Sequence, residues 1–251
     1  MRSLGTLGDD FSEAYDINDS SQVVGVSNIS DNTYRAFLWE EGEGMLNLGT
    51  LPGGDFSSAY GINNNGQVIG FATEAGNNER AFLWEAGTGM QSLGVLPGAN
   101  ASYASDINDS GVVVGNSGRY EGAFLWDKDE GIQSLGTLGG TWSTAYGINN
   151  SGQVVGTSEK SNGPVVAYLW EDGVMQDLND LIDPASGWDL IDAYAINDAG
   201  QILGYGGRAG TGGELFLLTP VAPVPLPAVV WLMLSGLASL GRLKHRRAAA
   251  C

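Results

Sequence analysis

The side chains with the greatest capacity for chemistry are asparagine and aspartate oxygens at a fixed place in five copies of one phrase. The phrase reads SAYGINNNGQVIG from Ser58 to Gly70, and its relatives end at Gly25, Gly115, Gly156 and Gly204. Such oxygens are ligands for Ca²⁺, but the same residue types also cap tight turns. Because no D-x-[DN]-x-[DN]-G calcium loop is present, we expect turns and no cofactor, with Ca²⁺ as the alternative. The paired residues are Asn18–Asp19, Asn63–Asn64, Asn108–Asp109, Asn149–Asn150 and Asn197–Asp198.

The body of the chain, residues 1–218, contains no histidine or cysteine for nucleophilic or acid–base catalysis. The only cysteine is Cys251 and the only histidine is His245. A Ser-His-Asp or Cys-His arrangement and a histidine-ligated metal are therefore excluded there. We interpret paired carboxylates such as Glu40 with Glu41 as turn residues, and no pair stands out as a catalytic acid and base. We expect no catalytic residue and no enzyme.

Aromatic residues recur with the phrase and could stack on sugars, but their regular placement within strand-like runs predicts a packed core. Trp142 and Trp188 lie outside the repeated positions, near connections between repeats, and are the candidate ligand platform. The recurring set is Trp39, Trp84, Trp126 and Trp170 with Tyr15, Tyr60, Tyr146 and Tyr194.

The elements that position these residues are four strand-like runs in each repeat. A hairpin phrase supplies the first two, an AFLW-type run the third and an MQSLGTL-type run the fourth. The third run ends at Trp39, Trp84, Trp126, Trp170 and Leu218, which are 45, 42, 44 and 48 residues apart. Four short strands in such a period predict an all-β propeller blade. Gly66, Gly111, Gly152 and Gly200 should supply positive φ in the turns, where the first repeat has a strained Ser21.

The predicted propeller spans residues 1–218 and has five blades. Ser3–Leu7 matches the fourth strand of other repeats, so we expect it to complete the last blade and close the circle, unless further repeats precede Met1. Loops between the second and third strands vary most, and they should share a ligand-binding face with the connections between repeats. The repeats run over about 4–47, 48–92, 93–134, 135–177 and 178–218.

The net charge and the C-terminal tail indicate the kinds of partner and the cellular location. The formal net charge is -18, which disfavours nucleic acid as a partner. Residues 219–227 form a Pro-rich linker, and 228–247 combine an apolar stretch with a basic end. The apolar stretch just reaches the length of a transmembrane helix. The basic end predicts a cytoplasmic C-terminus with the repeats outside.

The tail resembles a PEP-CTERM sorting signal of the VPLPA type, and the AFLW and INNxGQVVG units resemble the HAF repeat of extracellular bacterial proteins. The resemblance implies an exosortase-type enzyme as partner, a membrane intermediate through the C-terminal helix, and then a place at the cell surface or outside the cell. Such proteins normally begin with a signal peptide, which the first ten residues do not provide, and no repeat carries the histidine of the HAF signature. The implied recognition motif is Val224, Pro225, Leu226, Pro227 and Ala228, and the implied retention patch is Arg242, Lys244, Arg246 and Arg247.

Three functions remain open from the sequence. The first is a non-enzymatic exported repeat protein at the cell surface or in the extracellular matrix. The second is a lectin-like propeller that binds exopolysaccharide. The third is a polysaccharide-cleaving enzyme that uses only carboxylates.

Overall fold

The computed structural model describes residues 2–29, 33–118, 122–208 and 212–221. The chain divides into a unit of residues 1–219 and a unit of 220–251. The predicted sorting motif, apolar span and basic patch all lie outside the described residues. Among the residues described, no helix is long and apolar enough to cross a membrane.

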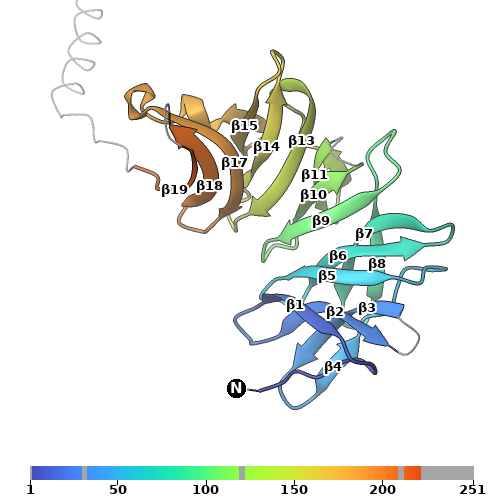
Figure 1. Ribbon diagram of the computed structural model, residues 1–251. Coiled ribbons are helices and arrows are strands. Elements are labelled where there is room, and N and C mark those ends of the chain that lie inside the picture. The colour runs from blue at the N-terminus through green and yellow to red at the C-terminus, as the bar shows by residue number, and fades with distance from the viewer. Residues whose placement is uncertain (1, 30–32, 119–121, 209–211, 222–251) are drawn as a thin grey trace, which may run out of the picture. The chain divides into compact units, whose positions relative to one another are not determined.

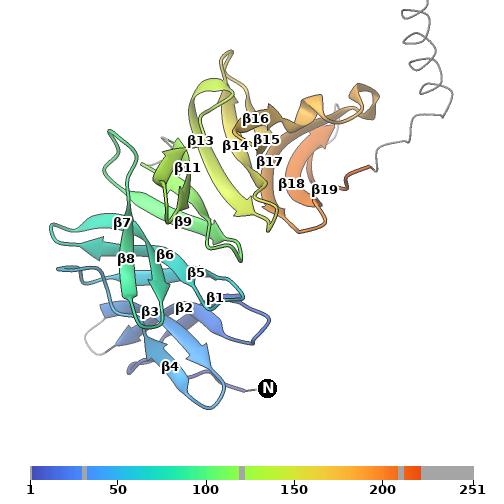
Figure 2. The same cartoon turned by 180° about the vertical axis from the view of Figure 1, so that it is seen from behind.

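Five antiparallel sheets follow one another in chain order (Figures 1 and 2). Four have four strands each and the fifth has three, each pairing in sequence order. This arrangement confirms an all-β, propeller-like repeat fold. The strands of the first two sheets are β1 (Ser12–Ile17), β2 (Val23–Ile29), β3 (Thr33–Glu40), β4 (Gly44–Asn47), β5 (Ser57–Ile62), β6 (Val68–Glu74), β7 (Asn78–Glu85) and β8 (Gly89–Gly94).

The third and fourth sheets repeat this plan, and two short 3₁₀ turns, η1 (Leu178–Asp180) and η2 (Pro184–Ser186), lead into the fifth. The remaining strands are β9 (Ser102–Ile107), β10 (Val113–Ser117), β11 (Gly122–Asp127), β12 (Gly131–Ser134), β13 (Gly139–Ile148), β14 (Val154–Lys160), β15 (Val165–Glu171), β16 (Val174–Asp177), β17 (Trp188–Ile196), β18 (Ile202–Arg208) and β19 (Gly213–Leu218).

The core consists of four apolar clusters, one at each junction between successive sheets. At the first junction, Val24 and Leu38 of the first sheet pack with Ala59 and Ile62 of the second. Alternate residues of a strand face opposite junctions, so Val68 belongs to the first cluster and Ile69 to the second. The AFLW-type runs of the first four sheets are apolar on both faces because both faces are covered, as the sequence predicts, whereas the last run exposes Leu215 and Leu217.

A serine ties each of the first three junctions together. Ser57 Oγ accepts the N–H of Ala36 at 2.9 Å and donates to the carbonyl of Gly49 at 2.6 Å. Ser102 and Ser143 make the same two contacts with the sheets that precede them. At the fourth junction Asn179 replaces the serine and exchanges two hydrogen bonds with the backbone of Leu190.

Each phrase ends in a glycine because the first strand of the sheet passes directly over it. A Cβ on Gly70 would lie 2.0 Å from the carbonyl oxygen of Ser58, and Gly25, Gly115, Gly156 and Gly204 face the same obstruction. The turn glycines have φ between 72° and 80°, which confirms the expected left-handed position. Ser21 adopts a φ of 61° there, as predicted for the one repeat without glycine.

The recurring tyrosines are not core residues, and this part of the core prediction is wrong. The register between the first two strands shifts at the same place in every sheet, a β-bulge whose extra residue is Ser105 in the third sheet and a tyrosine in the other four, Tyr15, Tyr60, Tyr146 and Tyr194. The bulge turns the tyrosine side chains outward, and they are between 36% and 44% exposed. Pairs stack edge to face across junctions, Tyr15 on Tyr60 and Tyr146 on Tyr194.

The predicted closing strand does not form. Ser3–Leu7 lies outside the strands, and the fifth sheet ends at β19 with three strands. The N–H of Leu7 instead donates to Ser27 Oγ at 2.9 Å, and Ser12 Oγ donates to the carbonyl of Gly5 at 2.8 Å. These contacts tie the segment to the first sheet. No strand pairing within the described residues joins the first sheet to the fifth.

Candidate functional site

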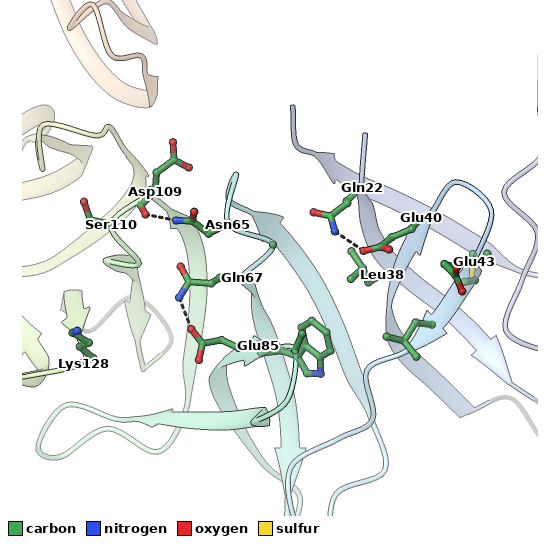
Figure 3. A pocket seen from close by; sticks show the side chains of 16 residues that line it. Gln22, Leu38, Glu40, Glu43, Asn65, Gln67, Glu85, Asp109, Ser110 and Lys128 are labelled. Atoms are coloured by element: carbon green, nitrogen blue, oxygen red, sulfur yellow. Dashed lines mark hydrogen bonds between the residues drawn. The ribbon is translucent and has the colours of Figure 1, made fainter. Parts of the chain in front are cut away.

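A groove of about 900 Å³ crosses the turns of the first three sheets (Figure 3). It is lined by the turns between the first and second strands and between the third and fourth strands of these sheets. In antiparallel sheets those turns lie at one end, opposite the loops that the sequence suggested as the ligand face. The lining residues used below are Gln22, Leu38, Glu40, Glu43, Met45, Leu46, Asn65, Gln67, Trp84, Glu85, Asp109, Ser110 and Lys128.

Two relays of side-chain hydrogen bonds hold the polar groups of the groove in place. In the second sheet, buried Asn63 donates Nδ2–H to Gln67 Oε1 at 2.6 Å, and Gln67 donates Nε2–H to Glu85 Oε1 at 2.5 Å. Asn18, Gln22 and Glu40 form the same relay in the first sheet. Each relay fixes its glutamine amide and engages Oε1 of its glutamate, while Thr88 Oγ1 lies 3.5 Å from Oε2 of Glu85.

The third sheet breaks this pattern. Val112 stands where the other sheets have the glutamine, and Asp127 stands where the first, second and fourth sheets have the glutamate. Asp127 Oδ1 accepts the backbone N–H groups of Asp129 and Glu130 in its own turn. On this side the groove is bounded by Asp109, Ser110 and Lys128, and Asn65 donates to the carbonyl of Asp109 at 2.6 Å. Figure 3 shows the Gln67–Glu85 pair between the third sheet and the Gln22–Glu40 pair.

Apolar side chains provide the rest of the lining. Trp84 and Leu38 are buried members of the first junction cluster, and Met45 is half-buried. Leu46 on β4 is 51% exposed. A lining that mixes fixed polar groups with apolar surface is typical of sites for small ligands and sugars.

The groove is negatively charged. Glu40, Glu43, Glu85 and Asp109 line it, and Lys128 is the only basic residue among the lining residues. The backbone N–H of Asn64 donates to Asp109 Oδ1 at 2.9 Å and, together with the side-chain amides of Asn150 and Asn64, lowers the pKa of this carboxyl. Asp109 therefore stays ionised below the usual range of aspartate, and an anionic ligand is disfavoured.

The asparagine and aspartate pairs serve the structure, as the turn interpretation predicts. Asn18 Oδ1 accepts the N–H groups of Ser20 and Gln22 within its turn. Its Nδ2–H also donates to the carbonyl of Asn63 in the next turn at 3.0 Å. Asn63, Asn108 and Asn149 continue this asparagine ladder from sheet to sheet. All five turns line a second, polar cavity of about 330 Å³.

The second residues of the pairs form a parallel series of contacts. The N–H of Asp19 donates to Asn64 Oδ1, that of Asn64 to Asp109, that of Asp109 to Asn150, and that of Asn150 to Asp198. Aspartate and asparagine alternate along this series, so amide donors separate the carboxylates. In the described part of the chain, no group of three His, Cys, Asp or Glu side chains is arranged to hold a metal ion.

The two tryptophans of the predicted platform lie in different sheets and outside the groove. Trp142 is half-buried on β13 of the fourth sheet. Trp188 begins β17 of the fifth sheet, packs edge to face on Phe216 at 6.2 Å, and has the guanidinium of Arg208 over its ring at 4.6 Å. Packing therefore occupies much of the Trp188 ring.

Sequence reasoning missed the groove residues, although a signal was present. In the first, second and fourth repeats a glutamine and a glutamate are 18 residues apart, as Gln22 with Glu40, Gln67 with Glu85 and Gln153 with Glu171. That constant spacing places the two side chains side by side on neighbouring strands. The third repeat, which lacks both residues, borders the groove through Asp109, Ser110 and Lys128.

Comparisons with known proteins give a fold likeness only. No family model matches the chain, and no curated protein matches it in sequence. The structure resembles TolB from Acinetobacter baumannii, with a TM-score of 0.53 and 12% identity over 84% of this chain, which spans about half (52%) of the TolB chain.

Two further solved structures align at lower scores. The SapL1 lectin in complex with alpha methyl fucoside has a TM-score of 0.41 and 14% identity, with 86% of this chain and 85% of that chain covered. A gluconolactonase from Xanthomonas campestris has a TM-score of 0.43 and 13% identity, with 86% and 78% covered. The likeness to TolB supports the repeat fold and carries no function.

Proposed function

We propose that this chain is a non-enzymatic, exported binding module that holds a neutral or amino-bearing polysaccharide in the groove across its first three sheets. The observation that carries the proposal is the pair of Asn-Gln-Glu relays beside apolar surface in a groove of about 900 Å³. Sugars present hydroxyl donors on one edge and apolar C–H surface on the other, which matches fixed carboxylate and amide groups beside Leu46 and Met45.

The charge of the groove narrows the class of polysaccharide. Four carboxylates and one lysine line it, so uronate or sulfate groups would meet repulsion, whereas hydroxyl and ammonium groups would find acceptors. A ligand with free amino groups gains charge-assisted hydrogen bonds to Glu85 and Glu40.

A cleavage reaction has less support than binding. Hydrolysis of a glycosidic bond needs a carboxylic acid that stays protonated near neutral pH. The groove carboxylate Asp109 has a lowered pKa, and Asp106, whose pKa burial raises to about 6, does not line the groove. We therefore place the function in binding.

A panel of immobilised oligosaccharides tests the proposal. We expect the full chain to bind oligomers of glucose and of glucosamine and to leave oligomers of glucuronate unbound. Binding confined to glucuronate oligomers would contradict the proposal. Loss of binding in Trp142→Ala or Trp188→Ala, with Glu85→Gln unaffected, would move the ligand to the platform predicted from sequence.

The proposed cellular location rests on the C-terminal tail alone. The chain is exported and sorted through Val224–Ala228 and Arg242–Arg247, with the membrane and an exosortase-type enzyme as partners. Deleting residues 228–247 should abolish membrane association in the native host. An unchanged membrane fraction would contradict it.

A further inference from the structure

The last sheet exposes three leucines on its outer face, and the first sheet exposes Ile17. On the last sheet Leu203 is 43%, Leu215 68% and Leu217 63% exposed, and on the first sheet Ile17 is 61% exposed. Single exposed apolar residues need no explanation. Here each exposed residue stands at a position that the repeat uses for packing between sheets.

The same positions are buried wherever one sheet of this chain covers another. Leu217 corresponds to Leu38 and Leu83, and Leu203 corresponds to Val24 and Ile69, all of which lie within junction clusters. Ile17 corresponds to Ile62, Ile107 and Ile148, which lie on the other side of those junctions. The last sheet thus presents one half of a junction and the first sheet presents the other.

The polar contacts of the junction are divided in the same way. In four turns the asparagine amide donates to the carbonyl of the next asparagine. Asn197 donates to Gln201 Oε1 as Asn18 and Asn63 donate to their glutamines, but it is the last asparagine of the ladder within the described residues. At the other end, the Asn18 carbonyl receives the N–H of Ser21. Asn197 is therefore a donor at the end of the ladder, and Asn18 is the matching acceptor at its start.

We propose that two copies of this chain associate head to tail, the last sheet of one copy against the first sheet of the next. Leu217 and Leu203 then pack around Ile17 as Leu38 and Val24 pack around Ile62. The asparagine ladder continues from Asn197 to Asn18, and Tyr194 meets Tyr15. The occupant is a second copy because the required surface is the face that this chain carries on its first sheet, and within the described residues no strand pairing joins that sheet to the chain's own fifth sheet. Such a heterologous contact can extend from copy to copy.

A pair of like charges at the proposed junction opposes association, and removing one of them gives a test. Inside the chain an asparagine always separates two aspartates, because Asn150 Nδ2 donates to Asp109 at 3.1 Å and to Asp198 at 3.0 Å. At a head-to-tail junction Asp198 would lie beside Asp19, and both are carboxylates. Replacing Asp19 by asparagine restores the alternation, so Asp19→Asn should strengthen self-association.

Sedimentation velocity of the full chain measures this association. Mild detergent is added so that aggregation through the apolar C-terminal tail does not determine the result. We expect concentration-dependent oligomers. Asp19→Asn should tighten association about tenfold, as one charge-assisted hydrogen bond would. Leu217→Asp should abolish it, while the control Val174→Asp, on another exposed apolar residue, should leave it unchanged. A monomer at every concentration, or equal loss in Leu217→Asp and Val174→Asp, would overturn the proposal.

Cross-linking separates association between copies from closure within one copy. In a Cys251→Ser background, Ile17→Cys chains are mixed with Leu217→Cys chains under oxidation. A disulfide-linked heterodimer is expected, with few homodimers of either chain. If Ile17→Cys and Leu217→Cys in one chain instead cross-link within that chain at high dilution, the last sheet meets its own first sheet and the proposal fails.

Discussion

Asn63 donates its side-chain N–H to the backbone carbonyl of Asn108, 2.9 Å away in the next sheet, and both residues are buried. The same side chain accepts two N–H groups of its own turn and donates to Gln67. One residue therefore shapes a turn, links two sheets and anchors a relay of the groove.

Asn63→Ala should destabilise the protein by about 2–4 kcal/mol, because it leaves several buried polar groups without partners. The neighbouring Asn64→Ala removes contacts at an exposed position and should cost below about 1 kcal/mol. Urea unfolding followed by tryptophan fluorescence measures both values. Equal losses in the two variants would contradict a special role for the ladder residue.

Gly70→Ala should prevent normal packing of the second sheet. Its Cβ would lie 2.0 Å from the Ser58 carbonyl oxygen, and backbone at that distance cannot move without breaking the pairing of β5 and β6. We expect a loss above about 3 kcal/mol. Gly207→Ala is the control, since the nearest atom lies 4.0 Å from its Cβ. Thermal unfolding midpoints compare the two, and a midpoint of Gly70→Ala close to that of Gly207→Ala would be inconsistent with the geometry.

Asp106 should make stability depend on pH between about 4 and 6. Burial raises its pKa to about 6 in the folded state, although the N–H groups of Ile107 and Ile148 donate to the carboxylate. The folded state thus binds a proton that the unfolded state has released. Stability from this group is present below pH 4 and declines as pH rises to 6, by up to about 3 kcal/mol.

Asp106→Asn removes this titration. The difference in unfolding free energy between the variant and the wild type should change between pH 4 and 6 and stay constant above pH 7. Other carboxyls contribute equally to both proteins and cancel in the difference. A difference that does not vary with pH would show that Asp106 titrates normally.

The repeat plan could be predicted from sequence because each strand carries its own pattern. Turn residues such as Asn63 and Gly66, and the fully apolar AFLW runs, specify hairpins and strands locally. The exposed tyrosines could not be predicted so easily. A β-bulge shifts Tyr60 from the buried face to solvent, and alternation alone assigns that residue to the wrong side.

The groove and the missing closure depend on relations between strands that are separated in the sequence. Gln67 and Glu85 are far apart in sequence, and their meeting depends on the pairing of β6 with β7. Ser3–Leu7 has the sequence of a fourth strand but lies against the first sheet through Leu7 and Ser27. Similarity to a strand shows that a segment can pair, while a neighbouring strand must be present for pairing to occur.

The groove as binding site is tested most directly by calorimetric titration of a glucosamine hexamer into three proteins, the wild type, Glu85→Gln and Glu171→Gln. Glu171 pairs with Gln153 as Glu85 pairs with Gln67, but it lies outside the groove. We expect Glu85→Gln to weaken binding about tenfold or more through loss of a charged acceptor. Glu171→Gln should bind like the wild type. Equal affinities in all three proteins, or no binding by the wild type, would contradict the account.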